Sequence, residues 1–161
     1  MQAKDAIKSA LNQTQGMLPM YLADLSDADL LVRPVPNANH IAWQLGHIIN
    51  SEPELVHMEL PDAAYPKLPA GFAEQHSKET AAVDPPKGFL TKAEYLRLAK
   101  EVREATLALL DRVDIARPCS GKMAKFAPTL ADLFLMLSTH TMMHVGQFTV
   151  VRRKLGKPLV M

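Results

Sequence analysis

Apolar residues return every three or four positions along four stretches of the chain, which is the period of an amphipathic helix. The first stretch runs from about residue 3 to about residue 23, and its apolar positions include Ile7, Leu11 and Leu18. Pro19 falls inside this pattern. Because proline removes a backbone donor and clashes with the preceding turn, we expect a kink or a local break there.

A second helix is predicted to start near Asn39, a favourable N-cap residue, with Ile41 and Leu45 among its apolar positions. Pro53 is expected to kink this helix or to end it. Residues 62–89 then show no sustained period and are rich in proline and glycine, although residues 72–80 could form a short helix. A connection of this length is typical of a lid or a crossover.

The third helix has the clearest start. Thr91 and Glu94 form a capping box, in which each side chain satisfies a backbone donor of the other residue. Charged residues, among them Arg103, are expected away from the apolar face. That face is predicted to consist of Tyr95, Leu98, Val102, Ala105, Leu109 and Val113.

The fourth helix is predicted to open with a similar box formed by Thr129 and Asp132, and to close at Gly156 and Pro158. No stretch alternates with a period of two, so we expect no sheet. Four helices and a long connection predict an all-α four-helix bundle, with residues 1–161 forming a single domain. The long connection over 62–89 allows the second and third helices to run parallel.

The composition of the chain argues against nucleic-acid and membrane partners but does not indicate a function. The chain has 161 residues and a net charge of +1, which gives no reason to expect a nucleic-acid partner. No apolar run approaches the roughly 20 residues that span a bilayer, so no membrane partner is expected. The beginning of the chain lacks the continuous apolar core of a signal peptide. With a single cysteine, Cys119, we expect a cytoplasmic protein without an internal disulfide.

His140 and His144 are the most informative residues of the chain. Two histidines four apart on a helix lie on one face, and both can reach a metal ion at about 2.0–2.1 Å. The helix around them is largely apolar, and burying an imidazole costs free energy unless it finds a partner. A shared metal would supply that partner, and so would a carboxylate or a backbone carbonyl for each ring.

His47, on the second helix, is the best candidate for a third ligand. Three histidines with an open coordination position are typical of catalytic rather than structural metal centres. Gln44, Ser51 and Glu54 share the helix face of His47, and Gln147 follows His144. These four are the candidates to hydrogen-bond the site or to line its pocket, and the sequence identifies no catalytic base among them.

The other histidines are less informative. His40 is expected to be exposed at the start of the second helix, and His57 and His76 are expected to be solvated. Cys119 lies in a connection and shows no clear sign of a reactive thiolate.

Two glycines and a basic cluster also stand out. Gly46 and Gly146 lie in helix interiors beside the candidate ligands, where small residues allow two helices to approach closely, although ordinary packing explains either one alone. The cluster at 152–154 is expected to complement the dipole at the end of the last helix.

Three segments together resemble the DinB-like superfamily: residues 39–48 with a Trp-x-x-x-His pattern, residues 138–147 with His-x-x-x-His-x-Gly-Gln, and residues 152–158. The resemblance implies a four-helix bundle in up-down-down-up order, with a long crossover between helices two and three. It also implies a divalent metal, zinc or nickel above all, bound by His47, His140 and His144. Members of the family are often homodimers.

Activity is less transferable. Relatives include transferases that use a low-molecular-weight thiol as co-substrate, thiol-dependent isomerases and proteins labelled metal-dependent hydrolases. Our leading hypothesis is therefore a metal-dependent enzyme resembling thiol S-transferases and acting on a small molecule. The alternatives are a hydrolase that uses a metal-bound hydroxide, a non-catalytic metal- or ligand-binding dimeric bundle, and a dimer whose histidines are ordinary core residues.

Overall fold

The computed structural model describes residues 2–160, and this part of the chain is helical with irregular connections. The predicted all-α class is therefore confirmed. The only β pairing within these residues is a single bridge between Pro118 and Thr129. The elements are α1 (Ala3–Leu22), η1 (Asp29–Leu31), α2 (Ile41–His57), α3 (Phe72–Gln75), α4 (Lys92–Arg112), η2 (Met123–Lys125) and α5 (Leu130–Lys154).

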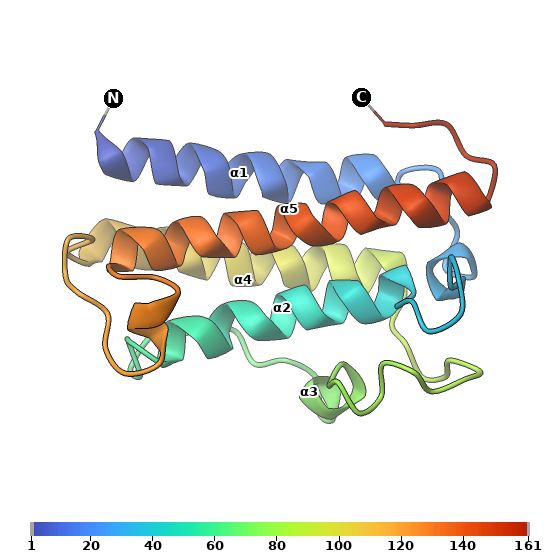
Figure 1. Cartoon of the computed structure of the whole chain (residues 1–161), viewed down its shortest axis with the longest axis horizontal. Helices are drawn as coiled ribbons and strands as arrows, with labels where there is room; N and C mark the ends of the chain where they lie inside the picture. The colour runs from blue at the N-terminus through green and yellow to red at the C-terminus, as the bar shows by residue number, and fades with distance from the viewer. Residues whose placement is uncertain (1, 161) are drawn as a thin grey trace.

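Four long helices lie along a common axis (Figure 1). α1 and α5 run in one direction, and α2 and α4 run in the other, which confirms the up-down-down-up order. α1 packs against α5 and α4, and α2 packs against the same two helices from the other side. The connection from α2 to α4 carries α3 along the outside of the bundle (Figure 1), so α2 and α4 run parallel as expected.

The helix starts follow the predicted capping chemistry at α4 and α5. Thr91 and Glu94 form a complete capping box, and so do Thr129 and Asp132. The start of α2 differs from the prediction, because its N-cap is His40 and not Asn39. The Nδ1 atom of His40 accepts a hydrogen bond from the backbone N–H of Trp43 at 3.1 Å.

Neither internal proline ends its helix. α1 continues past Pro19 to Leu22, and α2 continues past Pro53 to His57. The short helix expected over residues 72–80 forms only over Phe72–Gln75. None of the described helices combines the length and the apolar composition needed to cross a bilayer.

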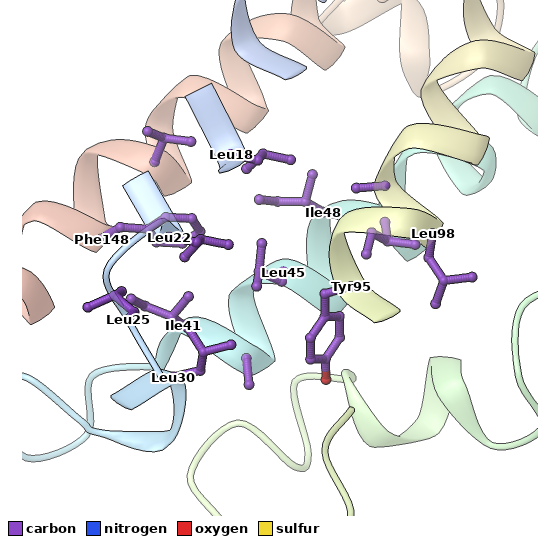
Figure 2. Close-up of a cluster of buried hydrophobic side chains, with 14 of the residues drawn as sticks. Leu18, Leu22, Leu25, Leu30, Ile41, Leu45, Ile48, Tyr95, Leu98 and Phe148 are labelled. Carbon is purple, nitrogen blue, oxygen red and sulfur yellow. The ribbon is translucent and has the colours of Figure 1, made fainter. Parts of the chain in front are cut away.

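Two clusters of apolar side chains fill the interior, one toward each end of the bundle. Figure 2 shows the first, to which all four long helices contribute. Its labelled members are Leu18, Leu22, Leu25, Leu30, Ile41, Leu45, Ile48, Tyr95, Leu98 and Phe148. The second includes Leu11, Val56, Leu110, Leu133 and Phe134.

Buried polar side chains also occur inside the bundle, and here the expectation that Arg103 faces away from the core is wrong. Arg103 is 2% exposed, and its Nη2 donates to Glu52 Oε2 at 2.8 Å and to Thr141 Oγ1 at 3.1 Å. Its Nη1 donates to the carbonyl oxygen of Leu11 at 2.8 Å, and Thr106 Oγ1 donates to Glu52 Oε1. The buried face of α4 is therefore rotated from the predicted one.

Arg152 does more than complement the helix dipole. It is 2% exposed and forms an ion pair with Asp24, which follows α1. Its Nη2 also donates to the carbonyl oxygen of Pro158 at 2.9 Å, and its Nη1 donates to that of Tyr21 at 2.8 Å. Arg152 therefore fastens the end of α1 and the C-terminal segment to α5.

Candidate metal centre

His47, His140 and His144 come together where α2 packs against α5. One nitrogen from each of the three rings lies within 4.8 Å of the other two. His140 and His144 direct their Nε2 atoms at each other across 3.2 Å. The ring centroid of His47 lies 5.2 Å from each of theirs.

The helices and their neighbours fix these rings. His140 and His144 lie one turn apart on α5, His140 half-buried and His144 6% exposed. The His47 ring stacks on the indole of Trp43, with centroids 5.0 Å apart and planes inclined by 8°. Trp43 Nε1 in turn donates to the carbonyl oxygen of Ser77 at 3.1 Å, which ties the site to the crossover between α2 and α4.

Gln44 controls the tautomer of His144. The amide Nε2 of Gln44 donates to the carbonyl oxygen of Asn39 at 2.8 Å, which leaves its Oε1 as an acceptor. That oxygen lies 3.0 Å from His144 Nδ1, so Nδ1 carries the proton. The Nε2 atom of His144 therefore presents a lone pair toward His140, as a metal ligand must.

The remaining candidates have different positions. Ser51 Oγ donates to the carbonyl oxygen of His47 at 2.6 Å and lies 3.5 Å from its Nδ1. Glu54 lines the same cavity as His47, and its Oε1 accepts from the side chain of Asn50 at 2.6 Å. Gln147 is exposed and, with Gln44, lines a separate apolar hollow.

Burial lowers the pKa of all three histidines, because a buried imidazolium loses its hydration. For His144, burial and the neighbouring His140 and His47 lower the pKa to about 3. After burial, the positive charge of Lys78 is the largest influence that lowers the pKa of His47. All three rings are therefore neutral at pH 7, the form that binds metal, and the set suits zinc or nickel.

A cavity of about 380 Å³ opens beside His47 and His140. Its volume is at the lower end of the range for small-molecule sites. Ser51, Glu54 and Lys78 supply its polar lining. The apolar wall consists of Leu55, Met123, Phe126 and Met136.

His76 and Gly46 both differ from the expectations. His76 was expected to be solvated but is 2% exposed, and its Nδ1 donates to the carbonyl oxygen of Phe72 at 2.7 Å. Its Nε2 accepts from the hydroxyl of Tyr95 at 2.8 Å, and Figure 2 shows this hydroxyl pointing out of the core. A Cβ on Gly46 would lie 2.0 Å from the His76 ring, whereas one on Gly146 would meet nothing within 4 Å. Gly46 therefore makes room for the crossover, and the two glycines are not a matched pair between helices.

His40, His57 and Cys119 lie outside the histidine cluster and differ in burial. His40 is 1% exposed, so its expected exposure is wrong, whereas His57 is exposed as expected. Cys119 is buried, and burial raises the pKa of its thiol, so it has no features of a reactive thiolate. Sequence reasoning missed Lys78, Met123 and Phe126, because no local pattern marks the residues that the connections bring to the site.

Solved structures with this arrangement support the fold. YfiT from Bacillus subtilis, described as a probable metal-dependent hydrolase with an unusual four-helix bundle topology, is 16% identical, with a TM-score of 0.66 over 96% of this chain and 89% of that one. A conserved protein from Enterococcus faecalis is 19% identical, with a TM-score of 0.61 over 98% of this chain and 99% of that one. Comparison with curated proteins finds no match. The DinB superfamily model matches residues 10–148, so the chain belongs to the DinB superfamily.

Proposed function

We propose that the protein is a metal-dependent enzyme acting on a small molecule. The observation that carries this proposal is the convergence of three neutral imidazoles, with ligand atoms within 4.8 Å of one another, beside an open cavity. His47, His140 and His144 would hold a divalent ion there. Such an ion would lower the pKa of a water or a thiol bound to it, and so supply a nucleophile near neutral pH.

Hydrolysis is the chemistry that we place first, ahead of thiol transfer. Glu54 lines the cavity together with His47 and His140, and its carboxylate is the group available there to accept a proton from an attacking water. Ser51 lies on the same wall and holds the backbone of His47 through its hydroxyl. The description of YfiT as a probable metal-dependent hydrolase also supports this order.

Thiol transfer is the second candidate, and the surroundings of the histidine rings favour it. Their polar neighbours are the amide of Gln44 and the hydroxyl of Ser51, and no carboxylate hydrogen-bonds a ring nitrogen of the site within residues 2–160. A thiol needs no such base, because coordination to a divalent ion is enough to deprotonate it. The family resemblance to thiol S-transferases supports the same candidate.

Metal content tests the proposal directly. We expect about one divalent ion per chain in the untagged protein purified without chelators, and none in the His140→Ala variant. His57→Ala is the matched control, since His57 is an exposed histidine of α2 outside the cluster, and it should retain the ion. A wild-type protein that lacks metal and does not bind added zinc or nickel would contradict the proposal.

Glu54→Gln then separates the two chemistries. This change preserves size and removes the base, so we expect the ion to be retained and ester or amide hydrolysis to fall by about 10²–10⁴-fold. Transfer of a thiol to an electrophile should be nearly unchanged. Equal hydrolysis by the wild type and the variant would remove Glu54 from the mechanism, whereas thiol transfer without any hydrolysis by the wild type would favour the second candidate.

We further propose that the protein works as a homodimer, which the family resemblance also implies. α5 leaves large apolar side chains exposed, namely Leu135, Met142, Met143 and Val150. Burying them against a second copy would remove this apolar surface from water, which favours association. Sedimentation equilibrium should show a dimer that Met143→Asp weakens and that Met58→Asp, at an exposed methionine after α2, does not.

A further inference from the structure

We propose that the cavity selects amphipathic anions, with an apolar body against its wall and an anionic group at Lys78. This inference rests on the proposed function, because it assigns a substrate class to the same metal centre. It draws on the charge of the cavity, on the way the crossover places Lys78, and on the exposed apolar side chains beside it.

With a divalent ion bound to the three histidines, the net charge of the cavity would be positive. Lys78 is the only cationic side chain among the described residues that line it, and within residues 2–160 no carboxylate lies within ion-pair distance of its ammonium group. A divalent ion on three neutral histidines would add its own charge. Glu54 supplies one negative charge, and the nearby Glu52 is already paired with Arg103 inside the bundle. An anionic ligand would therefore be favoured over a cationic one.

The backbone before Lys78 is fixed to α2, although the lysine side chain itself is exposed. The carbonyl oxygen of Ser77 accepts from Trp43 Nε1 at 3.1 Å and from Thr80 Oγ1 at 2.9 Å. His76 is seated over Gly46 and hydrogen-bonded to Tyr95. These contacts fix the backbone next to Lys78, which lines the cavity together with His47. The positive charge of Lys78 is therefore held near the site.

The lining of the cavity also offers an apolar surface. Leu55, Met123, Phe126 and Met136 come from α2, from η2 with the residue after it, and from α5. Phe126 is 76% exposed, and a ring left in water at the mouth of a cavity is a ready contact for an apolar ligand. Methionine side chains adapt to ligands of different shape. A substrate that extends from the metal into the cavity would therefore find both apolar contacts and the cationic group of Lys78 in its lining.

Thiol probes test this inference without relying on turnover. In cobalt-loaded protein, a thiol that binds the ion produces a charge-transfer band, so its dissociation constant can be measured by absorption. We would compare ω-mercaptocarboxylates of three, six and eight carbons with the matching mercaptoalcohols. Each pair shares the metal-binding thiol and the apolar chain, and differs only in the distal charge.

We expect the wild-type protein to bind the best carboxylate about fivefold more tightly than its alcohol, the ratio for a partly exposed ion pair. Lys78→Met should abolish this ratio, and Lys78→Arg should retain it. Lys87→Met is the matched control, because Lys87 is an exposed lysine of the same crossover that does not line the cavity, and it should leave the ratio unchanged.

Each contrary result has a separate meaning. A wild-type ratio near one, or a ratio that survives in Lys78→Met, would overturn the assignment of Lys78 and leave the metal centre in place. Failure of the protein to bind cobalt at all, seen as the absence of its visible spectrum, would overturn the proposed function and this inference with it.

Discussion

Two groups of polar side chains lie side by side in the middle of the bundle, one fully buried and one partly open, and they differ in what their hydrogen-bonding atoms contact. Around Glu52 and Arg103, guanidinium, carboxylate and hydroxyl groups satisfy one another within the protein. In the histidine group, Nδ1 of His144 donates a hydrogen bond to Oε1 of Gln44, and Nε2 of His144 faces Nε2 of His140. The first group is a closed network. In the second, the two Nε2 atoms share one hydrogen bond at 3.2 Å, and His47 and His140 also line a cavity that a ligand can enter.

The two groups share one turn of α5. Thr141, between the two histidines in sequence, accepts from Arg103 and donates to the carbonyl oxygen of Leu137 at 3.0 Å. The closed network therefore holds the backbone from which the histidines project. We propose that the network serves stability and that the histidines serve chemistry, and substitutions in each group can separate these two roles.

The largest expected effect comes from opening the closed network. Arg103→Met would leave the Glu52 carboxylate buried without its cation, and we expect the free energy of unfolding to fall by about 3–5 kcal/mol. Urea denaturation of the metal-free protein measures this loss. The matched control is Arg97→Met, at an exposed arginine of α4 paired with Glu101, which should change stability by less than about 1 kcal/mol.

Neutralising Glu52 as well should recover part of the stability that Arg103→Met loses. In Glu52→Gln/Arg103→Met the unpaired charge is gone, so part of the lost stability should return. If Arg103→Met costs no more than Arg97→Met, the network has no special role in stability and the proposed division of roles is wrong.

His40 provides the next test, because its lone pair is already used inside the protein. Its Nδ1 accepts the backbone N–H of Trp43, and burial lowers its pKa to about 4. Below pH 6.5 the unfolded chain binds a proton that the folded chain does not, so stability falls as the pH drops and the loss levels off near pH 4. The lowered pKa corresponds to a loss of about 3 kcal/mol.

The His40→Asn variant isolates this contribution. Asparagine also caps helices but does not titrate, so the variant should lose less stability between pH 6.5 and pH 4 than the wild type. The measurement is the free energy of unfolding of metal-free protein at several pH values. Parallel curves for the two proteins would show that His40 does not contribute to acid sensitivity.

Residues governed by local rules were predictable from the sequence, and residues governed by distant partners were not. The capping boxes at Thr91 and Thr129 follow from residues three apart, and the shared face of His140 and His144 follows from the helical period. The burial of Arg103 depends on a carboxylate from another helix, which no spacing along α4 reveals. Lys78 reaches the site through the path of the crossover.

Alanine substitutions at Gly46 and Gly146 should change the free energy of unfolding by smaller amounts and in opposite directions. Gly46→Ala would place a methyl group on the His76 ring, so we expect a loss of about 1–3 kcal/mol as the crossover shifts. Gly146→Ala meets nothing within 4 Å and replaces glycine inside a helix, so it should stabilise the protein by up to about 1 kcal/mol. Thermal unfolding measures both, and a Gly46→Ala variant as stable as the wild type would contradict the assigned role of Gly46.

The last expected effect is on metal affinity rather than on the fold, and it comes from Gln44. Gln44→Met preserves length and removes the oxygen that fixes the Nδ1 proton of His144, so the metal-binding tautomer is no longer favoured. Removing such a partner weakens metal affinity by about 10–100-fold, which competition with a chromophoric chelator can measure. The free energy of unfolding of the metal-free protein should change much less than in Arg103→Met.

Gln147→Met is the matched control for this change. Gln147 lies on α5 close to the same histidine, but its side chain is exposed and, within residues 2–160, has no hydrogen bond to the three rings. Its metal affinity should equal that of the wild type. Equal affinities in all three proteins would mean that Gln44 does not orient His144 for a metal.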